Sequence, residues 1–377
     1  MKSPRHIPRP GTISWYHLDK GDGRMRLKRT RVGFFGVLGG RQVAGAALVM
    51  VALLFLMPVS LLSGEPLYQR EGDLPAGDAG GDQSSPGQAE PLASARDRGR
   101  AVRLQKTDGT IVELTMADYL WGVVAAEMPA SFEEEALKAQ ACAARTYTVL
   151  KQNSGSEKHP GADICGDSTC CQAYVERSAA EARWGLNAVE YGEKIDRAVA
   201  GTDGLGILYQ GQPIQALFFS SSPGKTVDAV EVWGRRVDYL TSVDSPEGEE
   251  VPNYHSQVVL SAREVKDLTL AAYPGADLSG DPGTWFGEAF RNEGGTVSSM
   301  LLGGVTLTGG QVRTLFSLRS AAFTVAWDGE NFTFDVTGYG HGVGMSQYGA
   351  NAMAKEGKSF RDILTWYYTG TTVEELW

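Results

Sequence analysis

The feature that most constrains this chain is a run of twenty residues without a charge, VAGAALVMVALLFLMPVSLL at positions 43–62. At 1.5 Å per residue, a helix of that length spans roughly 30 Å, the thickness of a bilayer's hydrocarbon core. Pro58 lies near one end, where a membrane helix tolerates it. The run therefore predicts a transmembrane helix. A cleaved signal peptide is the rival, although its apolar stretch would normally be shorter.

Charge is distributed unevenly about this run. Residues 1–42 carry ten Lys or Arg and two Asp, a net charge of +8, so with −10 for the whole chain −18 falls on the remainder. Because positive residues stay on the cytoplasmic side, we expect 1–42 to be a basic cytoplasmic tail of a single-pass cell-membrane protein. The extracytoplasmic part is acidic, which argues against nucleic acid as a partner.

The segment after the predicted anchor has two parts. Residues 63–100 contain few large apolar side chains and many Gly, Pro, Ser and Asp, which predicts a flexible linker. From Ala101, apolar and polar residues alternate around Asp108-Gly109, a β-hairpin pattern that recurs around Asp328-Gly329. We therefore expect 101–377 to be one extracytoplasmic α+β domain of mixed helices and antiparallel hairpins, long enough for two lobes around a cleft.

Two helices are predicted after the first hairpin. The first covers 117–126 and ends before Pro129, because the residue preceding a proline is pushed out of the helical region. In the second, Ser131 and Glu134 fit a capping box, and the acids at 133–135 complement the positive end of the helix.

Glu127 differs from that acidic cluster. It stands at the C-terminal end of the first helix, where the negative pole of the dipole disfavours another negative charge. Its neighbours Ala125, Ala126 and Met128 offer little solvation. Both effects would raise the pKa of the carboxyl, which a general acid near neutral pH requires. The structural alternative is an exposed glutamate at a helix end that has no catalytic role.

A glycine-rich loop follows the last predicted hairpin. GYGHGVGMSQYG at 338–349 lacks the spacing of a nucleotide-binding G-x-G-x-x-G, but its glycines would let the backbone approach a ligand. A tight strand-to-helix turn is the structural alternative. The loop's candidate sugar-binding residues are Tyr339, Gly340, His341, Gly342, Ser346, Gln347 and Tyr348.

The stretch SSSPGKT at 220–226 invites comparison with a phosphate-binding loop. That motif fails here because Phe219 stands where its first glycine should be. Ser220, Ser221 and Ser222 are instead candidates to line a substrate groove.

Three of the four cysteines cluster with a histidine. His159, Cys165, Cys170 and Cys171 fall within thirteen residues, and one imidazole with three thiolates can form a tetrahedral zinc site. Outside the membrane, a disulfide from Cys165 to Cys170 or Cys171 is the alternative. Cys142, in an alanine-rich helix, is expected to be a small buried hydrophobe.

Two long segments carry a family resemblance. YLWGVVAAEMPASFEEEALKAQACAARTYTV and GYGHGVGMSQYGANAMAKEGKSFRDILTWYYTGTTVEEL resemble the signature segments of the stage II sporulation protein D family. Its members are membrane-anchored lytic transglycosylases of peptidoglycan, and the glutamate of their Ala-Glu-Met-Pro motif, here Glu127, is the catalytic acid and base. The resemblance also implies that Arg145 faces the cleft and that the His–Cys cluster binds structural zinc.

The resemblance further implies a biological setting. It suggests septal wall remodelling and engulfment during sporulation, glycan strands stripped of stem peptides as substrate, and stage II sporulation proteins M and P as partners. Two other functions remain open: a non-catalytic cell-wall binding or scaffold module, and a peptidoglycan hydrolase that uses a second acid such as Asp118 or Asp335.

Overall fold

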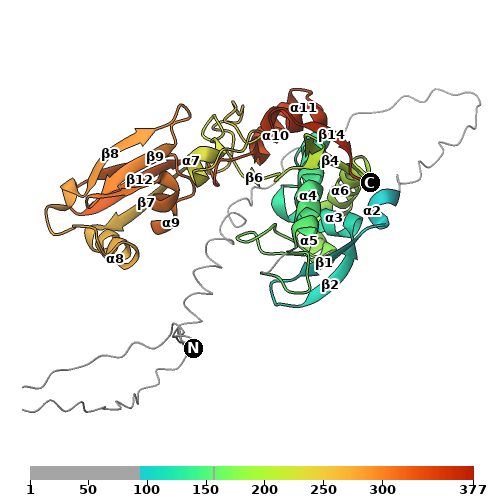
Figure 1. Ribbon diagram of the computed structural model, residues 1–377, viewed down its shortest axis with the longest axis horizontal. Coiled ribbons are helices and arrows are strands. Elements are labelled where there is room, and N and C mark those ends of the chain that lie inside the picture. Colours follow the sequence, from blue (N-terminus) through green and yellow to red (C-terminus); the bar gives the residue numbers. More distant parts are fainter. Residues whose placement is uncertain (1–93, 156–157) are drawn as a thin grey trace, which may run out of the picture. The chain divides into compact units, whose positions relative to one another are not determined.

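The computed structural model describes residues 94–155 and 158–377 (Figure 1). The predicted cytoplasmic tail at 1–42, the predicted transmembrane helix at 43–62 and the linker as far as residue 93 lie outside the described residues. Within the described ranges, no helix is both long enough and apolar enough to cross a bilayer.

The described chain is a mixed α+β fold with antiparallel sheets, as predicted. The predicted hairpin at 101–116 forms from β1 (Ala101–Gln105) and β2 (Ile111–Thr115), which pair antiparallel across the Asp108-Gly109 turn. The helices that follow are α3 (Met116–Glu127), α4 (Glu134–Ser154), α5 (Arg177–Trp184) and α6 (Ala188–Ala200).

Helix α4 is the centre of the first hydrophobic core. It contacts α3, α6, β4 (Leu205–Tyr209), and the C-terminal helices α10 (Gln347–Lys355) and α11 (Phe360–Tyr367) (Figure 1). Its side chains at the contacts are small, which lets neighbouring backbones approach closely. The fully buried residues include Ala136, Ala139, Ala141, Ala143, Ala144 and Cys142. The predicted burial of Cys142 is therefore confirmed.

A small sheet closes this core. In it β4 lies between β14 (Thr372–Glu375) and β5 (Gln212–Pro213), both antiparallel to it. Gly357, which has φ of 85°, lies between the two C-terminal helices α10 and α11.

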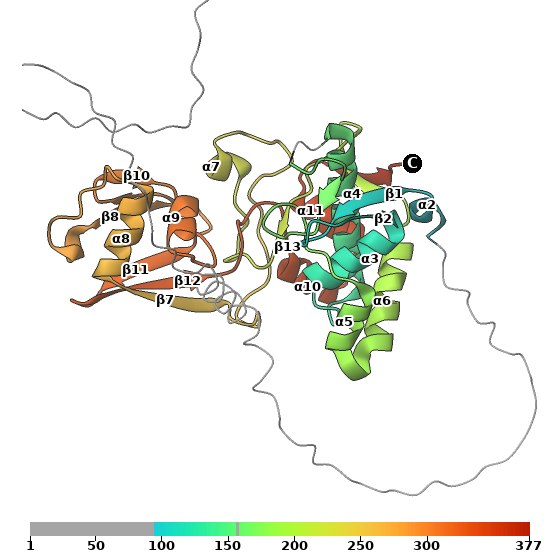
Figure 2. The ribbon, with the colours of Figure 1, turned by 90° about the horizontal axis from the view of Figure 1, so that it is seen from below.

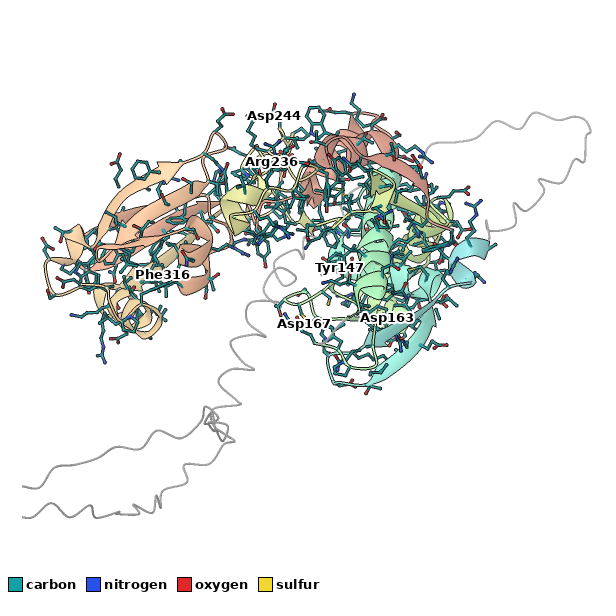
Figure 3. The ribbon with its side chains drawn as sticks, viewed as in Figure 1. Tyr147, Asp163, Asp167, Arg236, Asp244 and Phe316 are labelled. Atoms are coloured by element: carbon teal, nitrogen blue, oxygen red, sulfur yellow. The ribbon has the colours of Figure 1, made fainter. Side chains whose placement is uncertain are left out.

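A second hydrophobic core forms around residues 255–337. Its main sheet orders β11 (Phe323–Trp327), β12 (Asn331–Thr337) and β7 (His255–Ser261), with α8 (Ala262–Ala272) against β7 and β12 (Figure 2). The other sheet orders β10 (Val305–Leu307), β9 (Val297–Leu302) and β8 (Phe286–Arg291), with α9 (Gly309–Leu315) against β9. The centre of this second core is aromatic. It includes Phe316, labelled in Figure 3, together with Phe286, Phe332 and Phe334.

Short segments join the two cores. β6 (Phe218–Phe219) pairs in parallel with β13 (Met345–Ser346), so the serine-rich turn and the end of the glycine loop lie side by side. The short helix α7 (Ala229–Trp233) follows that turn. Another short strand, β3 (Ile164–Cys165), runs parallel to β1.

The predicted capping box at Ser131 is wrong. Helix α4 begins at Glu134, and its N-cap Glu133 makes no side-chain cap. The backbone N–H of Glu133 is bound instead by Asn351 Oδ1 of α10, at 2.8 Å. A tertiary contact thus replaces the local cap, and Glu134 pairs with Lys138 and Arg197.

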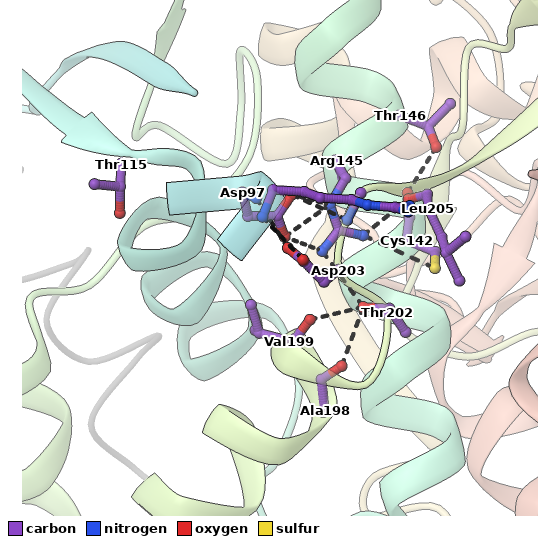
Figure 4. A network of polar contacts seen from close by, with 12 residues as sticks. Asp97, Thr115, Cys142, Arg145, Thr146, Ala198, Val199, Thr202, Asp203 and Leu205 are labelled. Atoms are coloured by element: carbon purple, nitrogen blue, oxygen red, sulfur yellow. Dashed lines mark hydrogen bonds and ion pairs between the residues drawn. The ribbon is translucent and has the colours of Figure 1, made fainter. Parts of the chain in front are cut away.

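Arg145 does not face a cleft, so that expectation is also wrong. Its side chain is completely buried, and its Nη2 lies 2.6 Å from Oδ2 of an equally buried carboxylate, Asp97 (Figure 4). Its Nη1 donates to the carbonyl oxygen of Leu205 at 2.9 Å. A guanidinium can be buried when its charge and its donors are satisfied in this way.

The same ion pair places the start of the fold earlier than predicted. Asp97 lies in α2 (Ala95–Arg98), inside the segment interpreted as linker. The carboxylate of Asp203 accepts the backbone N–H groups of Arg96 and Asp97 at 2.9 and 2.8 Å, which fixes this turn. Residues 94–100 therefore belong to the folded domain.

We expect Asp97→Ala to lower the free energy of unfolding by about 3–5 kcal/mol, because it leaves the buried Arg145 guanidinium without its counter-charge. The matched control is Arg236→Gln, which breaks the exposed Arg236–Asp238 pair and should cost about 0–1 kcal/mol. Urea unfolding of both variants measures the difference. Equal midpoints would show that the buried pair does not hold the start of the fold.

Candidate active site

Glu127 is the last residue of α3, as the sequence predicts. The chain turns extended at Met128, and the carboxyl group is half-buried against the first core. Burial raises its pKa above the ordinary value, while hydrogen bonds from the Ala173 backbone and the Gln347 side chain act in the opposite direction. The net direction is upward, so the site shifts the carboxyl group toward its neutral form relative to an exposed glutamate.

The backbone N–H of Ala173 donates to Glu127 Oε1 at 2.6 Å. The loop that carries Ala173 is anchored by the preceding residue. Gln172 is buried and donates from Nε2 to Tyr119 Oη at 3.0 Å and to Thr148 Oγ1 at 3.1 Å. The loop is therefore tied to both α3 and α4 next to the carboxyl group.

The predicted His–Cys cluster assembles at the start of this loop. One potential ligand atom from each of His159, Cys165, Cys170 and Cys171 lies within 4.8 Å of the other three. His159 Nε2 is 3.4 and 3.5 Å from the sulfurs of Cys170 and Cys171. Tetrahedral zinc with its usual bond lengths separates nitrogen and sulfur ligands by about 3.5 Å, so the group fits a metal ion. All four cysteines of the chain are free thiols.

Strand pairing orients the histidine of this cluster. The register of β1 and β3 pairs Gln105 with Cys165, and Gln105 Oε1 lies 2.9 Å from His159 Nδ1. Because an amide oxygen only accepts, Nδ1 carries the proton and Nε2 keeps its lone pair for a metal. Ala173 follows Cys171 by two residues, so the cluster and the Glu127 contact share one short loop.

The glycine loop approaches the protein's own backbone closely. Gly338, Gly340, Gly342 and Gly344 all have positive φ. A Cβ on Gly344 would lie 2.1 Å from the carbonyl oxygen of Leu217, and one on Gly340 would lie 2.6 Å from Cβ of Phe219. These glycines are thus required for packing against β6, which supports the strand-to-helix turn that the sequence left as an alternative.

Several predicted sugar-binding side chains are internal. Ser221, Ser222 and Ser346 are 3%, 0% and 0% exposed, so these three hydroxyls do not line a groove, contrary to expectation. Ser220 is half-buried, and its carbonyl oxygen accepts from the Tyr348 N–H at 3.0 Å. Their role is to hold the serine turn against the glycine loop.

Gln347 is also buried, at 6% exposed, whereas Tyr339 and Tyr348 are more accessible. Gln347 reaches Glu127, and Tyr348 packs edge-on against Phe132 with ring centroids 4.9 Å apart. Tyr339 is exposed beneath the guanidinium of Arg319, at 4.2 Å. Burial lowers the pKa of His341 to about 4, which keeps its ring neutral beside Phe219. The structure therefore brings Gln347, but not the whole predicted set, to Glu127.

Glu247 is a functional candidate that sequence reasoning missed. Its buried carboxylate accepts from the Ser222 N–H at 2.6 Å, from Ser245 Oγ at 2.5 Å and from the Ser346 hydroxyl. Ser245 also contacts Tyr367 Oη at 2.6 Å. This network fixes Ser346, the N-cap of α10, and hence the neighbouring Gln347.

The acidic run EGEE at 247–250 looks like a solvated loop, so composition conceals the role of its first residue. The sequence feature that points to this role is Gly349 inside α10, because only a glycine leaves room for these side chains. A Cβ there would lie 2.4 Å from Ser245 Oγ and 2.5 Å from Glu247 Oε2.

The two acids considered as partners of Glu127 lie elsewhere. Asp118 is in the first turn of α3, bonded to the Thr115 cap. Nine residues of helix put it about 13 Å along the axis from Glu127. The paired carboxyls of glycosidases lie within about 10 Å of each other. Asp335 is exposed on β12 and accepts from Gln257 at 2.9 Å.

Comparisons with known proteins give a consistent answer. A family model described as stage II sporulation protein matches residues 105–209. Stage II sporulation protein D of Bacillus subtilis is 38% identical over 71% of this chain and 76% of its own length. The Bacillus amyloliquefaciens protein of that name is 38% identical over 73% and 79%. An amidase enhancer of Bacillus subtilis is 29% identical over 67% of this chain and 40% of its own length.

We expect the full chain to bind one divalent metal ion, with Co²⁺ as the probe. Three thiolates and one imidazole should give the thiolate-to-cobalt charge-transfer band of a tetrahedral site, measured by absorption titration. Cys171→Ser should weaken binding strongly, whereas the control Cys142→Ala should leave it unchanged. A chain that binds no cobalt when reduced, or binds it equally well after Cys171→Ser, would contradict this assignment.

Proposed function

Because this chain belongs to the stage II sporulation protein D family, we propose that it is a peptidoglycan lytic transglycosylase with Glu127 as its single acid and base. The bond cleaved is the one between N-acetylmuramic acid and N-acetylglucosamine. The observation that carries the proposal is a half-buried carboxyl of raised pKa, held by an N–H and an amide rather than by a second carboxylate.

The proposed reaction needs one proton carrier. Neutral Glu127 protonates the glycosidic oxygen as the bond to the anomeric carbon breaks. The muramic acid's own 6-hydroxyl then attacks that carbon and gives its proton to the Glu127 carboxylate, which restores the acid and forms a 1,6-anhydro ring. Water does not enter the products, so no second acid has to position it.

The neighbours of Glu127 have distinct parts in this scheme. Ala173 N–H occupies Oε1, which leaves Oε2 to carry the proton toward the sugar. The same N–H and the Gln347 amide stabilise the carboxylate while the proton is away. Glu247 acts as a positioning residue, because its bond to Ser346 fixes the helix start from which Gln347 projects.

A structural zinc ion would supply no chemistry of the reaction. All four ligand positions would be taken by His159, Cys165, Cys170 and Cys171, so none is left for a water. Bound there, zinc would brace the loop whose Ala173 N–H contacts Glu127.

The setting we propose is the outer face of the cell membrane, with residues 43–62 as the anchor and the described domain facing the wall. The names of the Bacillus relatives support a role in sporulation. We propose stripped glycan strands at the septum, during engulfment, as the substrate, and stage II sporulation proteins M and P as partners.

A second candidate is a non-catalytic wall-binding module that assists another enzyme. The similarity to a protein named amidase enhancer favours it. The two candidates differ in whether this chain alone releases cleaved glycan.

We expect Glu127→Gln to lower release of 1,6-anhydro-muramic ends by at least about a hundredfold, because it removes the transferable proton. Stripped glycan strands are digested with the full chain and the ends are quantified by mass spectrometry. Glu133→Gln is the matched control, an exposed acid six residues away that should retain full activity. Reducing ends instead of anhydro ends would favour a hydrolase, and no released ends from the wild type would favour the binding module.

The pH profile offers a separate test. A general acid must be protonated, so activity falls as pH rises through the pKa of Glu127 in the folded protein. The Gln347 amide lowers that pKa, so Gln347→Leu should raise it and move the alkaline limb of kcat/KM to higher pH. Gln212→Leu, at an exposed strand position, should leave the limb in place. A limb that stays fixed, or moves to lower pH, after Gln347→Leu would contradict the assignment.

A further inference from the structure

A pocket of about 450 Å³ lies beside the glycine loop and outside the immediate surroundings of Glu127. Its walls come from α7, from α9, from the start of β9 and the end of α8, and from His341. The volume is in the range of small-ligand sites. The residues used below are Arg313, Glu231, Trp233 and His341.

Arg313 is the one Lys or Arg among the lining residues, all of which the structure describes. Its Nε donates to the carbonyl oxygen of Arg319 at 3.1 Å. No carboxylate of the described residues is within ion-pair distance of it. Burial lowers the pKa of this guanidinium. A half-buried cation without a counter-charge is costly, and an anionic ligand would offset that cost.

The other polar groups of the pocket limit where an anion can sit. Glu231 accepts from Asn292 Nδ2 at 2.7 Å and repels a negative charge on its own side. His341 Nδ1 accepts the Val343 N–H at 3.1 Å, so the ring is neutral and adds no positive charge. An anionic group is therefore directed to Arg313, while Glu231 remains an acceptor for hydroxyl or amide donors.

Trp233 supplies an apolar wall. Its indole is 49% exposed and lies against His341, with ring centroids 6.3 Å apart. An accessible aromatic face, a guanidinium and a carboxylate acceptor together suit a ligand with an apolar face, an anionic group and several hydroxyls or amides. An acidic amino sugar has all of these.

We propose that this pocket binds an N-acetylmuramic acid residue whose lactyl carboxylate is free, with that carboxylate paired to Arg313 and the sugar face against Trp233. The inference rests on the proposed function and adds a basis for selecting strands without peptides. In a strand that carries stem peptides, this carboxylate is consumed in the amide bond to the first amino acid and offers Arg313 no charge.

The pocket and Glu127 are within reach of one glycan chain. His341 lines the pocket, and Gln347, six residues later, reaches Glu127. Six residues span at most about 21 Å when fully extended. The separation of these two residues is therefore within the length of an oligosaccharide of a few rings.

Binding is tested in the full chain, purified in detergent and carrying Glu127→Gln so that no turnover occurs. The probe is a stripped tetrasaccharide of alternating N-acetylglucosamine and N-acetylmuramic acid. Its counterparts are the same tetrasaccharide with lactyl methylamides and the same one bearing stem peptides. Calorimetry should show about tenfold tighter binding of the free acid than of the methylamide, and peptide-bearing strands should bind like the methylamide.

Introducing Arg313→Gln into the Glu127→Gln chain should remove this tenfold preference and leave binding of the methylamide unchanged. The control Arg263→Gln replaces an exposed arginine and should keep the tenfold preference. Arg313→Lys retains the charge and should keep part of the preference, so it serves if the glutamine variant does not fold.

The proposal is overturned if the preference survives Arg313→Gln or is absent from the wild-type pocket. Tighter binding of the peptide-bearing strand through Arg313 also overturns it, because a peptide carboxylate would then be the ligand. The product assay with Glu127 is independent of these outcomes.

Discussion

The hydrogen bond from the Ala173 backbone to Glu127 is the interaction on which this site depends, at 2.6 Å. It joins the end of α3 to a loop that begins in the His–Cys cluster and is tied down by Gln172. A carboxyl at a helix end would otherwise turn toward water and regain its ordinary acidity. Held against the core, it is desolvated, and its pKa is raised above the ordinary value.

A second uncharged contact to the Glu127 carboxyl comes from the Gln347 side chain. Gln347 is the first residue of α10, and the buried Glu247 fixes the start of this helix through its hydrogen bond with Ser346. Two supports therefore meet at Glu127, one from the Ala173 loop and one from the start of α10, which are far apart in sequence. Neither brings a second carboxylate, which is the reason that a one-acid mechanism fits this geometry better than a paired one.

Local signals in the sequence predicted the elements that local physics determines. Asp-Gly turns marked two hairpins, Pro129 marked the end of α3, and the spacing of His159 to Cys171 marked a metal-binding geometry. Long-range contacts decided the rest. Arg145 looks like any helix-surface arginine until a residue 48 positions earlier in the chain buries it. The serine turn is polar in sequence yet internal, because Glu247 satisfies it.

The most direct test of this account is the pKa of Glu127 itself, measured in the full chain by carboxyl-carbon NMR titration with glutamate-labelled protein. Loss of one resonance in the Glu127→Gln variant assigns the signal. We predict a midpoint above the ordinary value of 4.5 for a glutamate. A midpoint at or below that value would contradict the central claim, because the surroundings of the side chain would then not favour the proton that the proposed bond cleavage requires.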